Sequence, residues 1–146
     1  MDTELQQIII HIESSGNPHA MRFEPQFRAH LCEHIYDDNK IIHVIQTINK
    51  CSRDTALTIA ATSWGEFQIM GYNLYDLKYA NDVITFCSTQ KSQFDYFNKF
   101  LLSHDLTYSW KYMKDHKSEL DNFAFEYNGS VDYAKSMMRA ATALGF

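Results

Sequence analysis

Glu13 is the side chain whose position best suits acid–base chemistry. It ends an apolar segment, residues 3–13. Four apolar side chains recur there at helical spacing: Leu5, Ile8, Ile9 and Ile12. The following residues, SSGNP, contain a glycine that can cap a helix and a proline that prevents its continuation. The negative end of the helix dipole disfavours a charged carboxylate, and a carboxylic acid that keeps its proton can act as a general acid. A solvated glutamate at a helix end is the alternative that these residues leave open.

Residues 12–20 (IESSGNPHA) resemble the catalytic-glutamate motif of the lysozyme superfamily, which includes goose-type lysozymes and soluble lytic transglycosylases. Other segments are similar to one branch, the N-acetylmuramidase domain of phage endolysins. They are residues 22–27 (RFEPQF), 61–73 (ATSWGEFQIMGYN), 93–101 (QFDYFNKFL) and 123–129 (FAFEYNG). The chain has Gln26 where that branch usually has a histidine. The matches lie in the right order along the chain, and the resemblance as a whole extends over residues 5–145.

The resemblance implies that Glu13 is the general acid, which protonates the leaving glycosidic oxygen. Glu24, in the RFEP segment, is the better candidate for a second carboxylate, because Glu66 occupies a position that varies in the family. A structural role for Glu24, as an ion-paired or capping carboxylate, stays open beside the catalytic one. A carboxylate separation of about 5–5.5 Å would imply retention of configuration and about 6.5–9.5 Å inversion. We expect the wider gap, because Glu24 belongs to a loop that contains a proline.

The resemblance also implies five substrate-binding residues: Ser63, Gln68, Met70, Tyr127 and Asn128. The amides of Gln68 and Asn128 can both donate to and accept from an N-acetyl group. Tyr127 offers an apolar face for a sugar ring and a hydroxyl that could orient Glu13. Ordinary packing is the alternative for the tyrosine and the methionine. We assign Trp64 and Phe67 to the core.

The composition favours a helical, globular chain without a nucleic-acid partner. The 146 residues allow one domain, and 5 glycines with 2 prolines are few for a turn-rich β fold. A formal net charge of −5 provides no basic field for nucleic acid. The 3 cysteines contain no CxxC pair, which indicates free thiols made in a reducing compartment. Residues 30–34 (HLCEH) follow the order of inverted zinc peptidases, but no acidic ligand motif follows, so we predict neither a metal nor a cofactor.

We expect an all-α fold with two unequal lobes around a cleft and a possible short β element near 38–48. Helices are predicted near residues 3–13, 25–36, 54–61, 82–102, 106–114, 117–127 and 131–144. Asp54 is the predicted N-cap of the third helix, and residues 63–71 are predicted as a turn with one or two helical turns. The last helix should bury Tyr133, Met137, Ala141 and Leu144.

The resemblance implies a single catalytic domain, residues 1–146, without a separate wall-binding module. Its expected activity is that of an endolysin-type muramidase, which cleaves the β-1,4 bond between N-acetylmuramic acid and N-acetylglucosamine. A lytic transglycosylase that forms 1,6-anhydro ends is the alternative, and a non-catalytic wall-binding protein is a third. We expect a monomer that binds peptidoglycan glycan strands and does not insert into membranes. No signal peptide is recognisable, so we expect the protein to stay in the host cytoplasm until a holin-type lesion releases it to the cell wall.

Overall fold

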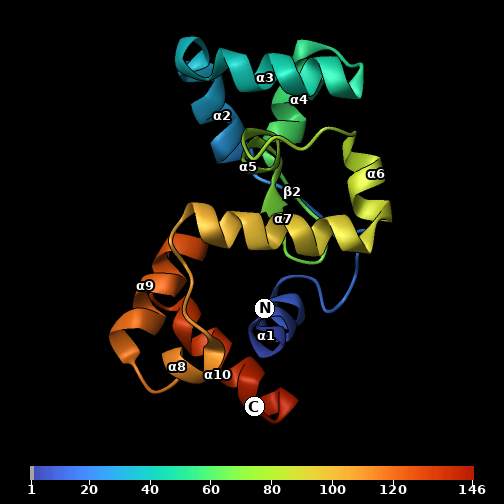
Figure 1. The fold of residues 1–146 in the computed structure, drawn as a ribbon. Coiled ribbons are helices and arrows are strands. Elements are labelled where there is room, and N and C mark those ends of the chain that lie inside the picture. The colour runs from blue at the N-terminus through green and yellow to red at the C-terminus, as the bar shows by residue number, and fades with distance from the viewer. Residues whose placement is uncertain (1) are drawn as a thin grey trace. The chain divides into compact units, whose positions relative to one another are not determined.

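The computed structural model describes residues 2–146, except the side chains of residues 35–39. Within that range the chain is α-dominated, as predicted, with helices α1–α10 and three short strands (Figure 1). The chain divides into two compact units. The first contains residues 1–16 and 101–146, and the second contains residues 17–100.

The first unit is helical. It contains α1 (Thr3–Glu13), α8 (Trp110–Met113), α9 (Lys117–Asn128) and α10 (Tyr133–Leu144). Helix α1 packs against α10, and α10 packs against α9. The packed face of α10 buries three of the four predicted residues, whereas Leu144 is 37% exposed in the last turn. Helix α8 is a single short turn, not a helix from 106 to 114, because Ser109 caps it and the chain leaves the helix after Met113.

The N-terminus of α1 is anchored inside this unit by Asp2. The Asp2 side chain caps the helix by accepting a hydrogen bond from the Leu5 amide at 3.1 Å. Its other carboxylate oxygen accepts from the backbone amide of Trp110, at the start of α8. Leu5, Ile8 and Ile9 are buried, as their spacing predicts. Helix α1 is therefore held at its N-cap and along its apolar face.

The second unit consists of helices around a small sheet. Its helices are α2 (Pro25–Glu33), α3 (Ile35–Asn49), α4 (Arg53–Ala60), α5 (Gly71–Asp76), α6 (Val83–Ser88) and α7 (Gln90–Ser103), of which the last three residues belong to the first unit. The possible strand near 38–48 is wrong, because this segment lies in α3. Its β-branched residues Ile41, Ile42 and Ile45 fit one helical face, which is buried, and α3 packs on α4.

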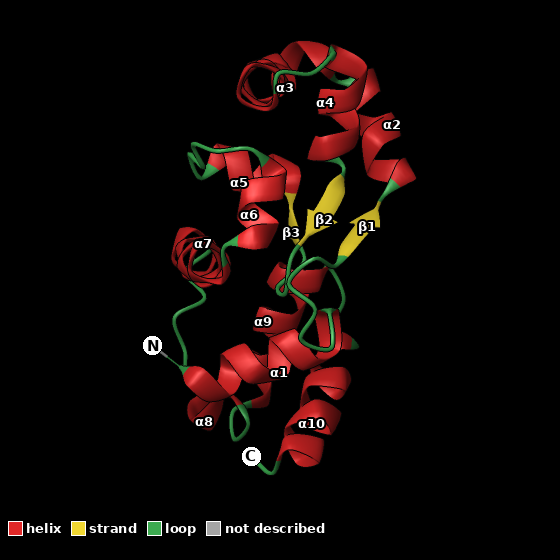
Figure 2. Cartoon of the chain, turned by 90° about the vertical axis from the view of Figure 1, so that its right-hand side faces the viewer, coloured by secondary structure: helices red, strands yellow, loops and turns green. Residues whose placement is uncertain are grey.

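The sheet contains β1 (Met21–Phe23), β2 (Thr62–Trp64) and β3 (Ile69–Met70). The strands are antiparallel in the order β1-β2-β3 (Figure 2). Residues 62–70 therefore form a β-hairpin, and the prediction of helical turns there is wrong. Strands of two or three residues are too short for an alternating apolar pattern to predict them. Strand β2 forms hydrogen bonds with β1, which lies about 40 residues earlier in the chain.

Two helix ends also differ from the predictions. Ser52 is the N-cap of α4, because its hydroxyl accepts from the Thr55 amide, and Asp54 lies in the first turn. The helix predicted over 82–102 is two helices, α6 and α7, separated by Thr89 in an extended conformation (φ −123°, ψ 91°). In the described part of the chain, none of the helices combines the length and the apolar character needed to cross a membrane.

Candidate active site

Glu13 is the last residue of α1, and the backbone turns sharply after it. The amide and the hydroxyl of Ser14 both donate to the carbonyl of Ile10, at 3.1 and 3.2 Å. Ser15 and Gly16 then adopt left-handed backbone conformations, with φ of 52° and 82°. The half-buried carboxylate is therefore carried by the end of a helix whose opposite side is packed in the core.

Tyr133 donates a hydrogen bond from its hydroxyl to Oε1 of Glu13 at 2.6 Å. Tyr133 is the first residue of α10, and only 7% of it is exposed. The packing of α1 on α10 brings these two residues together across 120 positions of sequence. The sequence places Tyr133 on a buried face, which is correct, but contains no signal that its hydroxyl would contact the candidate acid.

Tyr127, in the last turn of α9, also lies within the electrostatic influence of Glu13. Burial and the negative charge of Glu13 raise the pKa of the Tyr127 hydroxyl well above its ordinary value. Its ring stacks on Phe123 with centroids 5.6 Å apart and lies 5.9 Å from the Tyr133 ring. Asn128 follows as the exposed last residue of α9, before Gly129 at φ 83°. Glu13, Tyr127, Asn128 and Tyr133 therefore all lie in the first unit.

The other three predicted binding residues come together in the hairpin of the second unit. Ser63 in β2 is buried and pairs with Met70 in β3. Gln68 lies in the connecting turn at φ 49°, and its amide Nε2 donates to the carbonyl of Gly65 at 3.0 Å. Part of the Gln68 amide is thus engaged in holding the turn, in addition to the binding role that the resemblance implies.

The hairpin is braced by the fully buried amide of Gln93 from α7. Its Oε1 accepts from the Glu66 backbone amide at 2.6 Å, and its Nε2 donates to the carbonyls of Pro18 and Cys87 at 3.1 and 3.0 Å. The Glu66 carboxylate is itself buried and accepts from the side-chain amide of Gln90 at 3.1 Å. A single side chain therefore joins the turn, the segment before β1 and the end of α6.

Trp64 and Phe67 pack in the second unit, as predicted. Phe67 is buried and stacks on Phe97 with centroids 4.1 Å apart. Trp64 is half-buried, and its indole N–H donates to the carbonyl of Ile59 at 3.1 Å. A Cβ at Gly71 would lie 2.1 Å from the same carbonyl oxygen, so a glycine is required at this close approach.

Glu24 is held by its backbone between β1 and α2. Its amide donates to the carbonyl of Ala61 at 2.8 Å, and its own carbonyl accepts from the Arg28 amide at 3.1 Å. Its carboxylate pairs with Arg22, whose Nε lies 2.7 Å from Oε1. The side chain of Glu24 is 36% exposed and that of Arg22 is 59% exposed, so this ion pair adds little to the stability of the fold. It is nevertheless the orienting contact that a structural role for Glu24 predicts.

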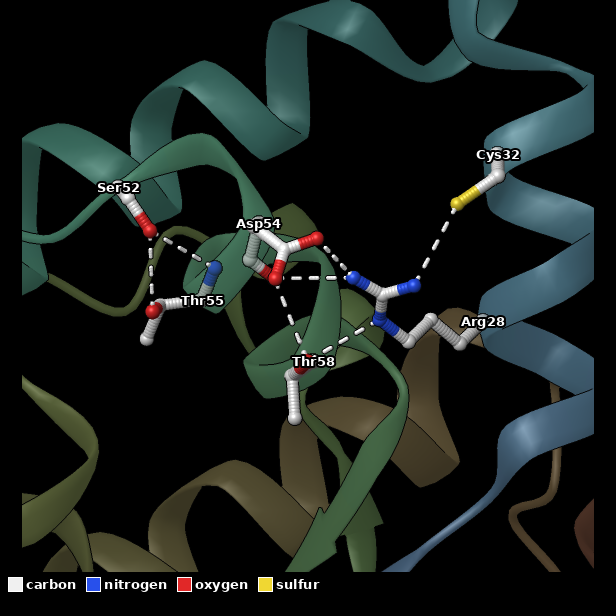
Figure 3. Close-up of polar contacts among 6 residues, drawn as sticks. All are labelled: Arg28, Cys32, Ser52, Asp54, Thr55 and Thr58. Atoms are coloured by element: carbon white, nitrogen blue, oxygen red, sulfur yellow. Dashed lines mark hydrogen bonds and ion pairs between the residues drawn. The ribbon is translucent and has the colours of Figure 1, made fainter.

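Arg28 joins α2 to α4 just beyond Glu24 (Figure 3). Its guanidinium binds the carboxylate of Asp54 and donates from Nε to the hydroxyl of Thr58 at 3.1 Å. Another nitrogen lies 3.8 Å from the sulfur of Cys32. This cluster holds the first turns of α2, and with them the backbone of Glu24, against α4.

His30, in the last turn of α2, and His34, the residue that caps this helix, lie next to one another, with ring centroids 4.4 Å apart. Among the residues that the structure describes, no group of three or more histidine, cysteine or acidic side chains is arranged to hold a metal ion.

The chain matches the family model for N-acetylmuramidase over residues 43–144. This range includes the hairpin and the α9 residues, but not Glu13 or Glu24. The chain is also 38% identical to the endolysin of Enterobacteria phage PRD1 over 147 residues, which cover 99% of each chain. No solved structure matches it. The chain therefore belongs to the phage endolysin N-acetylmuramidase family, and it is a glycoside hydrolase of the muramidase type that degrades bacterial peptidoglycan.

Proposed function

We propose that the enzyme hydrolyses the β-1,4 bond between N-acetylmuramic acid and N-acetylglucosamine, with Glu13 as the general acid. The observation that carries this proposal is the hydrogen bond from Tyr133 to Oε1 of Glu13, at the half-buried end of α1. The hydroxyl of Tyr133 orients the carboxyl group that would donate the proton to the glycosidic oxygen. The resemblance of residues 12–20 to the superfamily motif points to the same carboxyl group.

Glu24 is proposed as the second carboxylate, which activates the attacking water. Its backbone is fixed on both sides, and its partly exposed carboxylate is held in one orientation by Arg22. Inversion, with a water molecule between the two carboxylates, stays our prediction. Ser63, Gln68, Met70, Tyr127 and Asn128 are proposed to hold the sugars and their N-acetyl groups.

A lytic transglycosylase is the second candidate, and the Arg22–Glu24 ion pair is the observation that favours it. A carboxylate already engaged with an arginine suits a structural role. In a transglycosylase Glu13 alone would serve, and the 6-hydroxyl of the muramic acid would attack in place of water. The two reactions leave different ends on the same glycan fragments.

The deciding experiment digests purified peptidoglycan in ¹⁸O-labelled water and analyses the fragments by mass spectrometry. Hydrolysis gives reducing muramic acid ends that carry one ¹⁸O atom. Transglycosylation gives 1,6-anhydro ends that lack one water and carry no label. Reducing N-acetylglucosamine ends would contradict the proposed bond.

Glu13→Gln tests the assigned acid in the same assay. The amide is nearly isosteric with the carboxyl group but cannot donate a catalytic proton, and general acid–base help contributes about 10²–10⁴-fold. We expect normal folding and nearly complete loss of lysis. A variant that keeps more than half of the wild-type rate would contradict the role of Glu13. Glu119→Gln, on the first turn of α9, is the matched control.

The enzyme acts on the bacterial cell wall under this proposal. Its release to the wall through a holin-type lesion stays a prediction, as does the monomeric state.

A further inference from the structure

A cavity of about 560 Å³ lies in the first unit, between the first turns of α9 and α10. Its floor is apolar: Leu120 and Ala134 are buried there. Val131 and Met138 also line it and remain 54% and 42% exposed. The cavity has the size of a small-ligand site, and it contains neither Glu13 nor any residue named above as substrate-binding.

The rim of this cavity is positively charged, although the whole chain carries a net charge of −5. Three lysines and two aspartates line it. Lys117 pairs with Asp121, and Lys135 pairs with Asp132 at 2.8 Å, so both aspartates are already neutralised by lysines. Lys114 is the third lysine, and no acidic group of the described chain lies within ion-pair distance of it. The rim therefore keeps one uncompensated positive charge beside an apolar floor.

The first turn of α10 connects this cavity to Glu13. Tyr133 donates its hydroxyl hydrogen bond to Glu13, while its neighbours Asp132 and Ala134 line the cavity. The same turn thus presents one residue to the candidate acid and adjacent residues to the cavity. A group bound in the cavity would contact the segment that positions Glu13.

We propose that this cavity binds the acidic peptide that peptidoglycan carries on its muramic acid residues. Such short peptides combine alanine methyl groups with free carboxylates, which match an apolar floor and a lysine on the rim. The inference rests on the proposed function, because it assigns part of the substrate of the same reaction. It predicts that the enzyme prefers glycan that still carries its peptides.

The test compares kcat/KM on intact peptidoglycan fragments and on the same glycan after an amidase has removed the peptides. Wild-type enzyme should favour the peptide-bearing glycan by about 1.5-fold to fivefold, which is the range that single exposed ion pairs produce. Lys114→Glu should abolish this preference through a higher KM and should leave the rate on stripped glycan unchanged. Lys111→Glu makes the same charge change on the exposed side of α8, outside the cavity, and should keep the preference.

A direct binding measurement uses the free stem tetrapeptide, titrated into ¹⁵N-labelled protein. Amide shifts should centre on residues 114–138, and should disappear in Lys114→Glu and weaken at 1 M salt, where charges are screened within about 3 Å. A second variant, Met138→Gln, should reduce the shifts without affecting the ion pairs of the rim.

Equal cleavage of both glycans by wild-type enzyme, or equal losses on both in Lys114→Glu, would overturn the inference. So would Lys114-dependent binding of anionic phospholipid vesicles without binding of the peptide. Absence of cleavage on both substrates would contradict the proposed function instead, so the two failures can be told apart.

Discussion

Removing the Tyr133 hydroxyl is the most direct test of the Glu13 environment. Tyr133→Phe keeps the buried ring and deletes the 2.6 Å hydrogen bond to Oε1 of Glu13. A hydrogen bond to a charged group contributes about 1.5–3 kcal/mol, and we take about 1.5 kcal/mol because Glu13 is only half-buried. At 1.4 kcal/mol per tenfold, the loss of orientation should lower kcat about tenfold.

The pH dependence of Tyr133→Phe has a definite sign. The hydroxyl donates to the ionised carboxylate, so its removal makes the ionised form less favourable. A general acid is active while protonated, and its activity is lost as the pH rises. The alkaline limb of the kcat profile should therefore move to higher pH.

The assay is the rate of turbidity loss of purified cell walls between pH 4 and 9, together with thermal denaturation. Tyr112→Phe, on an exposed tyrosine of α8, is the control for loss of a phenol hydroxyl. An unchanged pH profile and rate, with a lower melting temperature alone, would refute the reasoning and make Tyr133 purely structural.

The remaining predictions concern the other candidate residues. Asn128→Ala should keep its melting temperature and lose about fivefold in turnover, because one substrate hydrogen bond contributes about 1 kcal/mol. Gln68→Ala should show a similar loss of turnover and also a small loss of stability, since its amide holds the hairpin turn; unchanged specific activity in both would make them structural. Glu24→Ala should slow hydrolysis strongly and leave binding largely intact, and added azide should partly restore the rate and yield an α-glycosyl azide; 1,6-anhydro products would contradict this role. Gln93→Ala should lower the free energy of unfolding by about 2 kcal/mol or more, because it leaves buried backbone groups without a partner; thermal denaturation measures it, and an unchanged melting temperature would contradict it.

The amphipathic helices could be predicted from local pattern. The spacing of apolar residues predicts α1 and α10, and Gly16 and Gly145 lie just beyond their C-terminal ends. Glu13 was identified in the same way, from its place after an apolar helix and from the motif that follows it. These features depend only on residues a few positions apart, so they can be predicted from the sequence alone.

The break between α6 and α7 depends on contacts that the sequence does not state. The carbonyls of Phe86 and Cys87, at the end of α6, are satisfied by the side chain of Gln93. Nothing in the residues around Thr89 reveals this, because the pattern of apolar residues continues through the break. A buried amide from the next helix makes the interruption favourable.

The hairpin and the Glu13–Tyr133 pair also depend on contacts between residues that are far apart in the sequence. Strand β2 exists because β1 offers it backbone partners, and the Gly65 turn is held from α7 by Gln93. Residues 13 and 133 meet because α1 packs on α10. The sequence by itself predicts Glu13 as the acid, from its helix and the motif that follows. The packing of helices far apart in the chain decided which hydroxyl holds it, because a hydrogen bond over 120 residues depends on positions that no local pattern encodes.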